Sequence, residues 1–452
     1  MKTPIIDFIK NYTSSNTARF HMPGHKGKNV MGCEESDITE INGADVLYHA
    51  DGIIAESENN ASQLFDTAHT FYSTEGSSLS IKAMLALTAY DNNATVEGQK
   101  PLVLAARNVH KSFVYACALL DLDVEFMYST DPEDHLCKCL ITPQTLKNAI
   151  GIAPYKPCAV YVTSPDYLGN TLDIKALAEI CHSYGIPLLV DNAHGAYLAF
   201  TEPSMHPIKL GADMCCDSAH KTLPALTGAG YLHISNSAPK AFLENARTRL
   251  SLFASTSPSY LILQSLDICN KYISEEIRNS LKITVKRINT LKEELSSKGY
   301  TLCGNEPLKI TIKTAASGIN GNDLAAILRK NGVESEYSDS EYLVLMLSPN
   351  NTEAEISLLR NTLLSTQTTA ATPEDSVTHD PVFPLERKCS IRKAIFAPHE
   401  TVSVANSVGR ICASPTVSCP PAVPIAISGE VITEQAAELF SFYGIDEIDV
   451  LK

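Results

Sequence analysis

The stretch AVYVTSPDYLGNTLDIKALAEICHSYGIPLLVD, residues 159–191, decides the fold class. It begins with the β-branched run Ala159–Thr163 and ends with a second apolar run, Ile186–Val190. Between them, apolar residues recur at helical spacing, with Asp173 as a capping residue before them and Gly185 as a terminator after them. A strand, a helix and a strand within about thirty residues predict a right-handed βαβ unit in a parallel sheet.

A second unit of the same kind lies upstream. Leu102–Ala106 is predicted to form a strand, Lys111–Leu120 a helix, and Val124–Met127 the next strand. A further strand near Ala212–Cys216 leads towards Lys221. These strands are apolar along their length, which is typical of a sheet covered on both faces. Ligands of such sheets bind at the carboxyl ends of the strands.

The chain of 452 residues is too long for one ordinary core. The stretch TQTTAATPEDSVTHDP lacks periodicity and predicts a linker. From residue 260 to residue 299, a charged helical pattern predicts one long helix that connects into a smaller domain. We therefore expect an N-terminal arm, a large domain, a small domain, the linker and a C-terminal domain, at residues 1–30, 31–265, 266–365, 366–381 and 382–452.

The charge balance restricts the partners. With 36 basic and 51 acidic residues, the net charge is −15, which disfavours nucleic acid because phosphate contacts need clustered Lys and Arg. The first ten residues, MKTPIIDFIK, do not resemble a signal peptide, because Asp7 interrupts their apolar stretch. No run approaches the ~20 apolar residues that span a bilayer. We expect a cytoplasmic protein, with no membrane partner, that binds a small molecule.

The thirteen cysteines are irregularly spaced. Cys137 and Cys139 form a CxC, and Cys215 and Cys216 are adjacent. Neither pair matches the repeated CxxC of zinc sites. The sequence therefore predicts reduced thiols and no metal.

Two charged residues stand where the chemistry of a parallel sheet is expected. Asp191 ends the second strand of the opening stretch, and a carboxylate there can keep a pyridine nitrogen protonated. It could equally cap a following helix. Lys221 follows thirty residues later in DSAHK. Lysine in a partly dry pocket loses basicity and forms Schiff bases, although most lysines are simply solvated.

Other polar residues complete a possible cofactor site. Gly76, Ser77 and Ser78 open a predicted helix whose free N–H groups could bind a phosphate, or Ser could be an ordinary cap. His110 follows a strand, where an imidazole could stack on a ring, cap a helix or lie at the surface. Ser218 and His220 flank Lys221 as phosphate ligands. This order and spacing favour pyridoxal 5′-phosphate (PLP), held by Lys221 as a Schiff base.

With these residues in hand, the chain resembles the bacterial ornithine/lysine/arginine decarboxylases of PLP fold type I over nearly its whole length. The matching blocks are HMPGHKG (21–27), RNVHKS (107–112), SPDYLG (164–169), DNAHGA (191–196), SAHK (218–221), SVGRICA (407–413) and PPAVPIAISGE (420–430).

The resemblance implies an α/β fold like that of aspartate aminotransferase, with a parallel-rich central sheet, a smaller α+β domain and a C-terminal α+β domain. It implies that Lys221 holds the PLP aldehyde, Asp191 pairs with the pyridinium, His110 stacks on the ring and His194 lies near the ring edge. The phosphate ligands it implies are Ser77, Ser78, Ser218 and His220.

It also implies a homodimer or an assembly of dimers. Because HMPGHKG begins near residue 21, the chain looks like the short form of the family, without an N-terminal wing domain.

The implied reaction is decarboxylation of arginine, lysine or ornithine to agmatine, cadaverine or putrescine, as in polyamine biosynthesis. The catalytic residues would be Lys221, His110 and Asp191, and Glu430 and Glu336 are candidates for binding the basic end of the substrate. The sequence leaves open which amino acid is used.

Two alternatives share the same cofactor machinery. An aminotransferase would bind the α-carboxylate with an arginine of the small domain, for which Arg329 and Arg360 are available. A catalytically silent PLP-binding protein is the other.

Four positions depart from the family pattern. Ala422 and Ser428 replace Gly and Pro in the C-terminal block, Gly228 stands where many members have Gln, and Asn192 stands where many short members have Glu. These changes leave the cofactor site intact but leave open the substrate and the role of the C-terminal loop.

Overall fold

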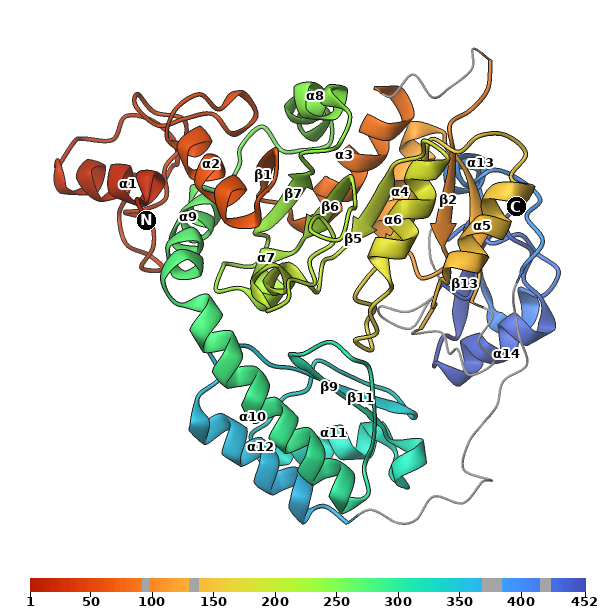
Figure 1. The fold of residues 1–452 in the computed structure, drawn as a ribbon. Coiled ribbons are helices and arrows are strands. Elements are labelled where there is room, and N and C mark those ends of the chain that lie inside the picture. Colours follow the sequence, from red (N-terminus) through yellow and green to blue (C-terminus); the bar gives the residue numbers. More distant parts are fainter. Residues whose placement is uncertain (92–97, 130–137, 368–383, 415–423) are drawn as a thin grey trace.

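The protein is described here by a computed structural model that covers residues 1–91, 98–129, 138–367, 384–414 and 424–452. Figure 1 shows a large sheet with its helices in the upper part of the view and a smaller α/β unit below it, built on α10 (Ile277–Lys298) and α12 (Glu353–Ser365). The C-terminal elements, which include α13 (Ile391–Phe396), lie beside β2 (Leu102–Ala106) on one flank of the large sheet.

The central sheet has the order β1-β7-β6-β5-β4-β2-β3. Only β7 runs antiparallel to its neighbours β1 and β6, and the remaining pairs are parallel. The strands are β1 (His69–Ser73), β2 (Leu102–Ala106), β3 (Asp123–Met127), β4 (Ala159–Thr163), β5 (Leu188–Asp191), β6 (Met214–Asp217) and β7 (Gly230–Ile234). The predicted parallel-rich α/β sheet is confirmed.

Helices cover both faces of this sheet, as its fully buried strands require. One hydrophobic cluster joins the sheet to α5 (Pro143–Ile152), α6 (Ile174–Ser183) and α14 (Glu434–Phe442). The other joins it to α3, α4, α8 and α13, whose bounds are Gly76–Tyr90, Lys111–Leu120, Lys240–Ser251 and Ile391–Phe396. The carboxyl ends of the strands are thereby held between two packed layers.

The opening βαβ unit folds as its sequence predicts. The side chain of Asp173 caps α6 by accepting a hydrogen bond from the backbone N–H of Ala176 at 3.1 Å. Gly185 follows the helix with φ of +62°, in the left-handed region that favours glycine. The helix therefore ends where β5 must begin.

The predicted single long helix from residue 260 is wrong. The segment forms α9 (Tyr260–Glu275) and α10 (Ile277–Lys298), separated at Glu276, whose φ of −127° is not helical. Gly299 ends α10 with φ of +110°. The N-terminal helices α1 (Pro4–Ser14) and α2 (Ile53–Phe65) share a hydrophobic cluster with α9.

The smaller unit carries a second, antiparallel sheet of order β10-β11-β9-β8. Its strands are β8 (Thr301–Cys303), β9 (Lys309–Lys313), β10 (Tyr337–Ser338) and β11 (Tyr342–Met346), packed with α10, α11 (Gly321–Lys330) and α12 (Glu353–Ser365). The C-terminal unit pairs β12 (His399–Ser403) with β13 (Glu447–Leu451). Residues 368–381 of the predicted linker, and Ala422, lie outside the described residues, and the exact domain boundaries stay a prediction.

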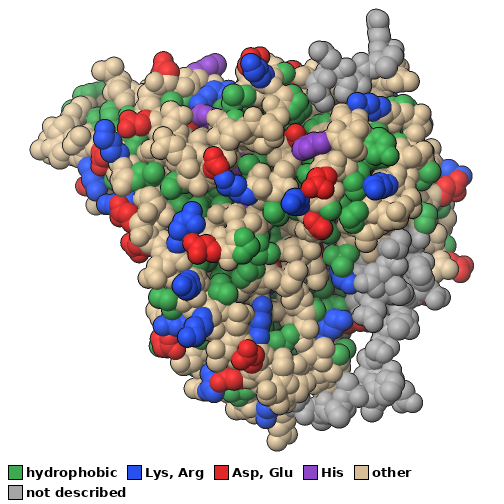
Figure 2. Space-filling view, viewed as in Figure 1, with side chains coloured by type: hydrophobic (Ala, Val, Ile, Leu, Met, Phe, Trp, Pro, Cys, Tyr) green, Lys and Arg blue, Asp and Glu red, His purple; other side chains and the backbone are tan. Residues whose placement is uncertain are grey.

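Figure 2 shows basic and acidic side chains interspersed over one face of the described chain. The expectation that nucleic acid is not the main partner stays a prediction. Within the described ranges, no helix is both long enough and apolar enough to cross a membrane.

Candidate active site

Asp191 lies at the carboxyl end of β5, with only 2% of its surface exposed. Its Oδ2 accepts a hydrogen bond from the Tyr161 hydroxyl at 3.1 Å, and its Oδ1 accepts one from the Ala193 N–H at 3.2 Å. Burial raises the pKa of Tyr161 well above its ordinary value, so the hydroxyl stays a donor. The next helical turn starts after Gly195, so Asp191 does not cap it.

Lys221 lies in the short helix α7 (Ala219–Thr222), which follows β6. Its Nζ lies 3.0 Å from Nε2 of His194. Much of the side chain is open to solvent, yet protein packed around the amine lowers the Lys221 pKa, while the Asp191 carboxylate acts in the opposite direction. The structure therefore brings Lys221, Asp191 and His194 to one place at the sheet edge.

His110 caps α4 and belongs to the same group of side chains. Its Nδ1 accepts a hydrogen bond from the Ser112 N–H at 3.2 Å, which leaves the Nε2 side of the ring free of this cap. Burial lowers the His110 pKa, and the charges of Asp191 and Lys221 also act on it. The capping role and the proposed ring-stacking role thus belong to one imidazole.

The four proposed phosphate ligands meet at the first turn of α3. The Ser218 hydroxyl donates to Ser77 Oγ at 3.0 Å, which joins the loop after β6 to this turn. The Ser112 hydroxyl donates to Ser78 Oγ at 2.8 Å. The N-cap residue Glu75 makes no side-chain cap, so the N–H groups of α3 that follow Gly76 stay available to an anion.

His220 and two glycines shape the same turn. The Nδ1 of His220 donates to the Ala229 carbonyl at 2.8 Å, and its ring lies 3.7 Å from the point where a Cβ of Gly76 would stand. A Cβ on Gly230 would lie 2.9 Å from the carbonyl carbon of Gly76. The backbone at Gly230 must therefore lack a side chain for the turn to approach β7.

This arrangement fits PLP. It offers an amine, a carboxylate for the pyridine nitrogen, an imidazole for the ring face and a helix start with hydroxyls for the phosphate. Buried polar atoms beside these residues also lack a partner within the described chain, namely both side-chain polar atoms of Asn108 and the hydroxyl of Thr222. Such atoms are rare in folded proteins and indicate a missing ligand.

The sequence did not point to Lys309. This residue opens β9 of the smaller unit, is 3% exposed, and places its Nζ 3.5 Å from Nδ1 of His194. Its amine also donates to the backbone carbonyls of Asp166 and Tyr167, each at 3.3 Å. Burial lowers the Lys309 pKa. No local pattern marks Lys309, although Asp166 and Tyr167 lie in the block SPDYLG.

The two candidate substrate acids have different surroundings. Glu336 is exposed, accepts a hydrogen bond from the Tyr167 hydroxyl at 2.8 Å, and acts electrostatically on Lys221. Glu430 is 2% exposed, and Arg107 binds both of its carboxylate oxygens, at 2.6 and 2.8 Å. Of these two candidate acids, Glu336 is therefore the one whose carboxylate is accessible to a cationic substrate.

The two arginines considered for an aminotransferase lie at the surface. Arg329 pairs with Glu334 at 2.8 Å, and Arg360 pairs with Glu294 at 2.5 Å. Each is at least partly solvated, and neither is among the charges that act on Lys221.

Three of the four departures from the family pattern are described. Gly228 has φ of +95°, and its carbonyl accepts the Gly76 N–H at 2.7 Å, so it supports the phosphate turn. The Asn192 amide donates to Asp217 Oδ1 at 2.7 Å. The buried Ser428 hydroxyl donates to the carbonyls of Ala413 and Ser414. None of these contacts disturbs the residues around Lys221.

The family model described as "Orn/Lys/Arg decarboxylase, major domain" matches residues 3–312. The chain belongs to the Orn/Lys/Arg decarboxylase family. It is an amino-acid decarboxylase that depends on PLP as its cofactor. The predicted family, enzyme class and cofactor are confirmed. The alternative that the protein is an aminotransferase is wrong.

Two relatives and one solved structure illustrate the likeness of this decarboxylase. The uncharacterized protein YaaO of Bacillus subtilis is 31% identical over 98% of this chain and 94% of its own length. An arginine decarboxylase of Halalkalibacterium halodurans is 30% identical over 96% and 91%. The lysine decarboxylase of Francisella novicida superposes with a TM-score of 0.79 at 17% identity, covering 100% of this chain and 81% of that one. The fold type I prediction is thereby confirmed.

Proposed function

We propose that this decarboxylase removes the α-carboxyl group of arginine, lysine or ornithine, and that Glu336 receives the cationic end of the substrate. The observation that carries the proposal is the position of Glu336, an accessible carboxylate within electrostatic reach of Lys221. Relatives named arginine decarboxylase support arginine as the first substrate to test.

In this proposal, the Lys221 amine would hold PLP through its aldehyde until a substrate binds. When bound, PLP withdraws the electron pair that the departing CO₂ leaves on the α-carbon. Asp191, held by Tyr161, keeps a proton on the pyridine nitrogen. His110 would pack on one face of the PLP ring, and either His110 or the Lys221 amine would deliver the proton that completes the product.

The surroundings also serve decarboxylation. Neither Arg329 nor Arg360 is placed to clamp the substrate carboxylate, because each is paired with a surface glutamate. A carboxylate that is poorly solvated in the bound state loses CO₂ more readily. The buried wall of Asp191, His194 and Lys309 limits access of water from the protein side.

The test is a substrate panel with added PLP, in which CO₂, amine and keto acid are measured. Arginine, lysine and ornithine are compared with the uncharged analogues citrulline and norleucine. We expect CO₂ and the matching amine in equal amounts from at least one basic substrate, and little from the analogues. Keto acid without CO₂, or no turnover of any basic amino acid, would contradict the proposal.

The role of Glu336 is tested with Glu336→Gln. Removal of a charge-assisted contact is expected to raise the KM for the basic substrate about tenfold, with little change in stability. Glu334→Gln, two residues away and paired with Arg329 at the surface, is the matched control. If both variants changed the KM equally, Glu336 would not be the residue that binds the cationic end of the substrate.

We also propose that two copies of the decarboxylase pair through the N-terminal arm. The arm and the residue that follows it expose large apolar side chains, with Phe20, Met22, Val30 and Met31 at 96%, 69%, 85% and 82%. Such a patch is typical of a surface covered by another chain. Sedimentation of the wild type is expected to show a dimer or larger assembly, and the variant Phe20→Asp/Met31→Asp a smaller species; a monomeric wild type would overturn this proposal.

A further inference from the structure

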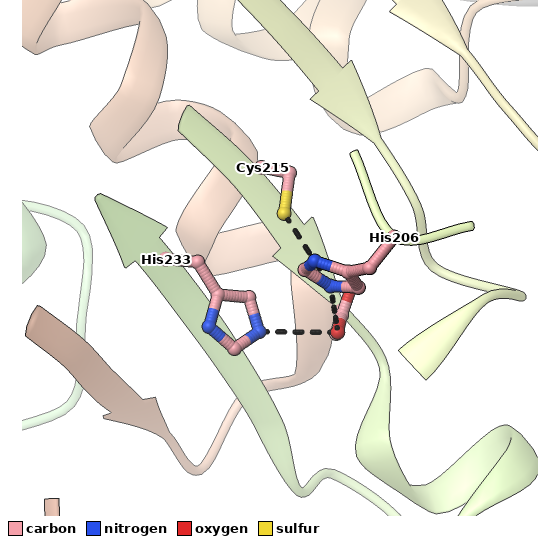
Figure 3. Close-up of side chains that lie close together, drawn as sticks. His206, Cys215 and His233 are labelled. Atoms are coloured by element: carbon pink, nitrogen blue, oxygen red, sulfur yellow. Dashed lines mark hydrogen bonds and ion pairs between the residues drawn. The ribbon is translucent and has the colours of Figure 1, made fainter. Parts of the chain in front are cut away.

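Four potential metal ligands lie together behind the cofactor site. His206, Cys215, Asp217 and His233 are each fully buried, and one ligand atom of each lies within 4.8 Å of all the others. Figure 3 shows both imidazole rings directed toward one carboxylate oxygen, and the Cys215 thiol directed toward the His206 ring. None of these residues belongs to the groups that surround Lys221.

Three of the distances between the ligand atoms are close to those of a four-coordinate centre. Asp217 Oδ2 lies 3.1 Å from Nε2 of His206 and 3.1 Å from Nε2 of His233, and Cys215 Sγ lies 3.8 Å from Nε2 of His206. In a tetrahedral zinc site the corresponding edges are about 3.3 Å between nitrogen and oxygen and about 3.6 Å between sulfur and nitrogen. Small shifts of the side chains would produce that geometry.

Sheet register brings three of the four together. Cys215 and Asp217 are two residues apart on β6, so their side chains point to the same face. His233 on β7 is directly opposite Cys215 in the antiparallel pair. His206 reaches over this face from the segment after Phe200. The contributing segments are all well away from the chain termini and the undescribed ranges.

Side chains around the cluster hold two of the four residues in place and exclude water. The His233 Nδ1 lies 2.9 Å from the Thr70 hydroxyl, and a donated N–H there leaves Nε2 free as a ligand. Asn192 donates to the second oxygen of Asp217 at 2.7 Å. Phe65 packs on the imidazoles of His206 and His233, with ring centroids 5.6 and 4.5 Å away. The cluster is therefore dry, and outer hydrogen bonds hold His233 and Asp217 in place.

We propose that His206, Cys215, Asp217 and His233 form a structural Zn²⁺ site. One thiolate, one carboxylate and two neutral imidazoles balance the charge of a divalent ion, which allows complete burial. The thiolate and the two imidazoles favour zinc over magnesium or calcium. All four positions are filled by protein, so the ion holds structure and does not activate water.

The ion would fix the strand that carries the cofactor lysine. Asp217 is the last residue of β6, and it precedes Ser218, which contacts the phosphate turn, and Lys221. Asp217 also accepts a hydrogen bond from Asn192, which is the residue that follows Asp191. Zinc would thus tie β6, β7 and the segment at His206 together on the side of the sheet away from the cofactor.

The competing arrangement is a hydrogen-bonded cluster without metal, in which the Asp217 carboxylate accepts from both imidazoles. In that arrangement the Cys215 thiol makes only a weak contact, 3.8 Å from Nε2 of His206. Nδ1 of His206 has no partner within the described structure in either arrangement. The two arrangements differ in whether the sulfur is a ligand.

The test measures metal in the holoenzyme after removal of any purification tag, because a histidine tag binds zinc itself. Cells grown with added zinc are expected to give about one zinc per chain. X-ray absorption of that zinc should show one sulfur at about 2.3 Å and three nitrogen or oxygen neighbours at about 2.0–2.2 Å. Zinc-free holoenzyme that stays zinc-free after equilibration with excess Zn²⁺, or zinc without a sulfur neighbour, would overturn the proposal.

Variants provide the second measurement. Cys215→Ser is expected to lose the sulfur neighbour and to release its zinc to a chelator that leaves the wild type loaded. Cys181→Ser, which changes another fully buried thiol of the same hydrophobic cluster, is expected to behave as the wild type. Equal zinc retention by the wild type and both variants would place the metal elsewhere and contradict the assignment. If Cys215→Ser does not fold, the wild-type absorption spectrum alone decides.

Discussion

The amine of Lys221 lies 3.0 Å from the His194 imidazole, with the Asp191 carboxylate close enough to act on it. Packed protein lowers the Lys221 pKa, which increases the fraction of neutral, nucleophilic amine near neutral pH. Asp191 opposes this effect because a negative charge favours the ammonium form. The balance between these two influences sets how readily the free enzyme captures PLP.

We expect the rate of PLP capture by the apoenzyme to rise with pH through the lowered pKa of Lys221. In Asp191→Asn the opposing charge is gone, so the profile should move to lower pH by about one unit. Stopped-flow absorbance over a pH series measures this. Asp173→Asn, which changes a helix cap that asparagine also fulfils, should leave the profile in place; an unmoved profile in Asp191→Asn would mean that Asp191 does not act on the lysine.

At the scale of elements, the phosphate turn depends on the close approach of α3 to the strands β6 and β7. The hydroxyl contact between Ser218 and Ser77 joins α3 to the end of β6, and Gly228 accepts the first N–H of the turn. Gly230 allows the contact, because any side chain there would meet the backbone of Gly76 and of Asp217. The phosphate turn thus depends on the positions of backbone atoms as much as on side chains.

We expect Gly230→Ala to weaken PLP binding. Its Cβ would lie 2.9 Å from Gly76 and 3.0 Å from the Asp217 carbonyl, and rigid overpacking of this kind costs about 1–3 kcal/mol. The apparent PLP affinity should fall about tenfold or more, as measured by equilibrium titration. Gly151→Ala on α5, where no atom lies within 4 Å, is the control. Unchanged affinity in Gly230→Ala would show that the turn is not part of the phosphate site.

Across the whole molecule, a buried ion pair fastens the C-terminal unit to the central sheet. Arg107 follows β2 directly, contacts both oxygens of Glu430 and donates to the Pro424 carbonyl at 3.0 Å. Its guanidinium also lies 4.9 Å from the centre of the Phe126 ring. His110 lies three residues after Arg107 in the chain. The ion pair between Arg107 and Glu430 therefore helps to position the active site as well as to stabilise the fold.

We expect Glu430→Gln to lower Tm by about 5 °C or more, because it leaves a buried guanidinium without its counter-ion, at a cost of about 3–5 kcal/mol. The KM for the basic substrate should stay close to that of the wild type. Glu336→Gln should show the reverse, with a raised KM and an unchanged Tm. Thermal unfolding and steady-state kinetics on both variants separate the two roles, and a raised KM with normal stability in Glu430→Gln would return Glu430 to the substrate site.

Local sequence determined much of this protein. The alternation of apolar runs and capped helical segments around residues 159–191 was sufficient for the parallel sheet, since a βαβ unit uses contacts that are near in sequence. The strand-end positions of Asp191 and Lys221 followed from the same pattern, and the family blocks supplied the cofactor and the reaction. The break between α9 and α10 at Glu276 was not predictable, because the periodicity on either side is continuous.

Only the tertiary structure decided which distant residues meet. Lys309 of the smaller unit contacts His194, and Arg107 pairs with Glu430, which is far away in the sequence. His206, from a loop, packs against His233 on β7. These pairings depend on how sheets and loops pack, and periodicity records only which face of its own element a residue occupies. For that reason the cysteine pattern predicted no metal, whereas the fold places one thiol, one carboxylate and two imidazoles together.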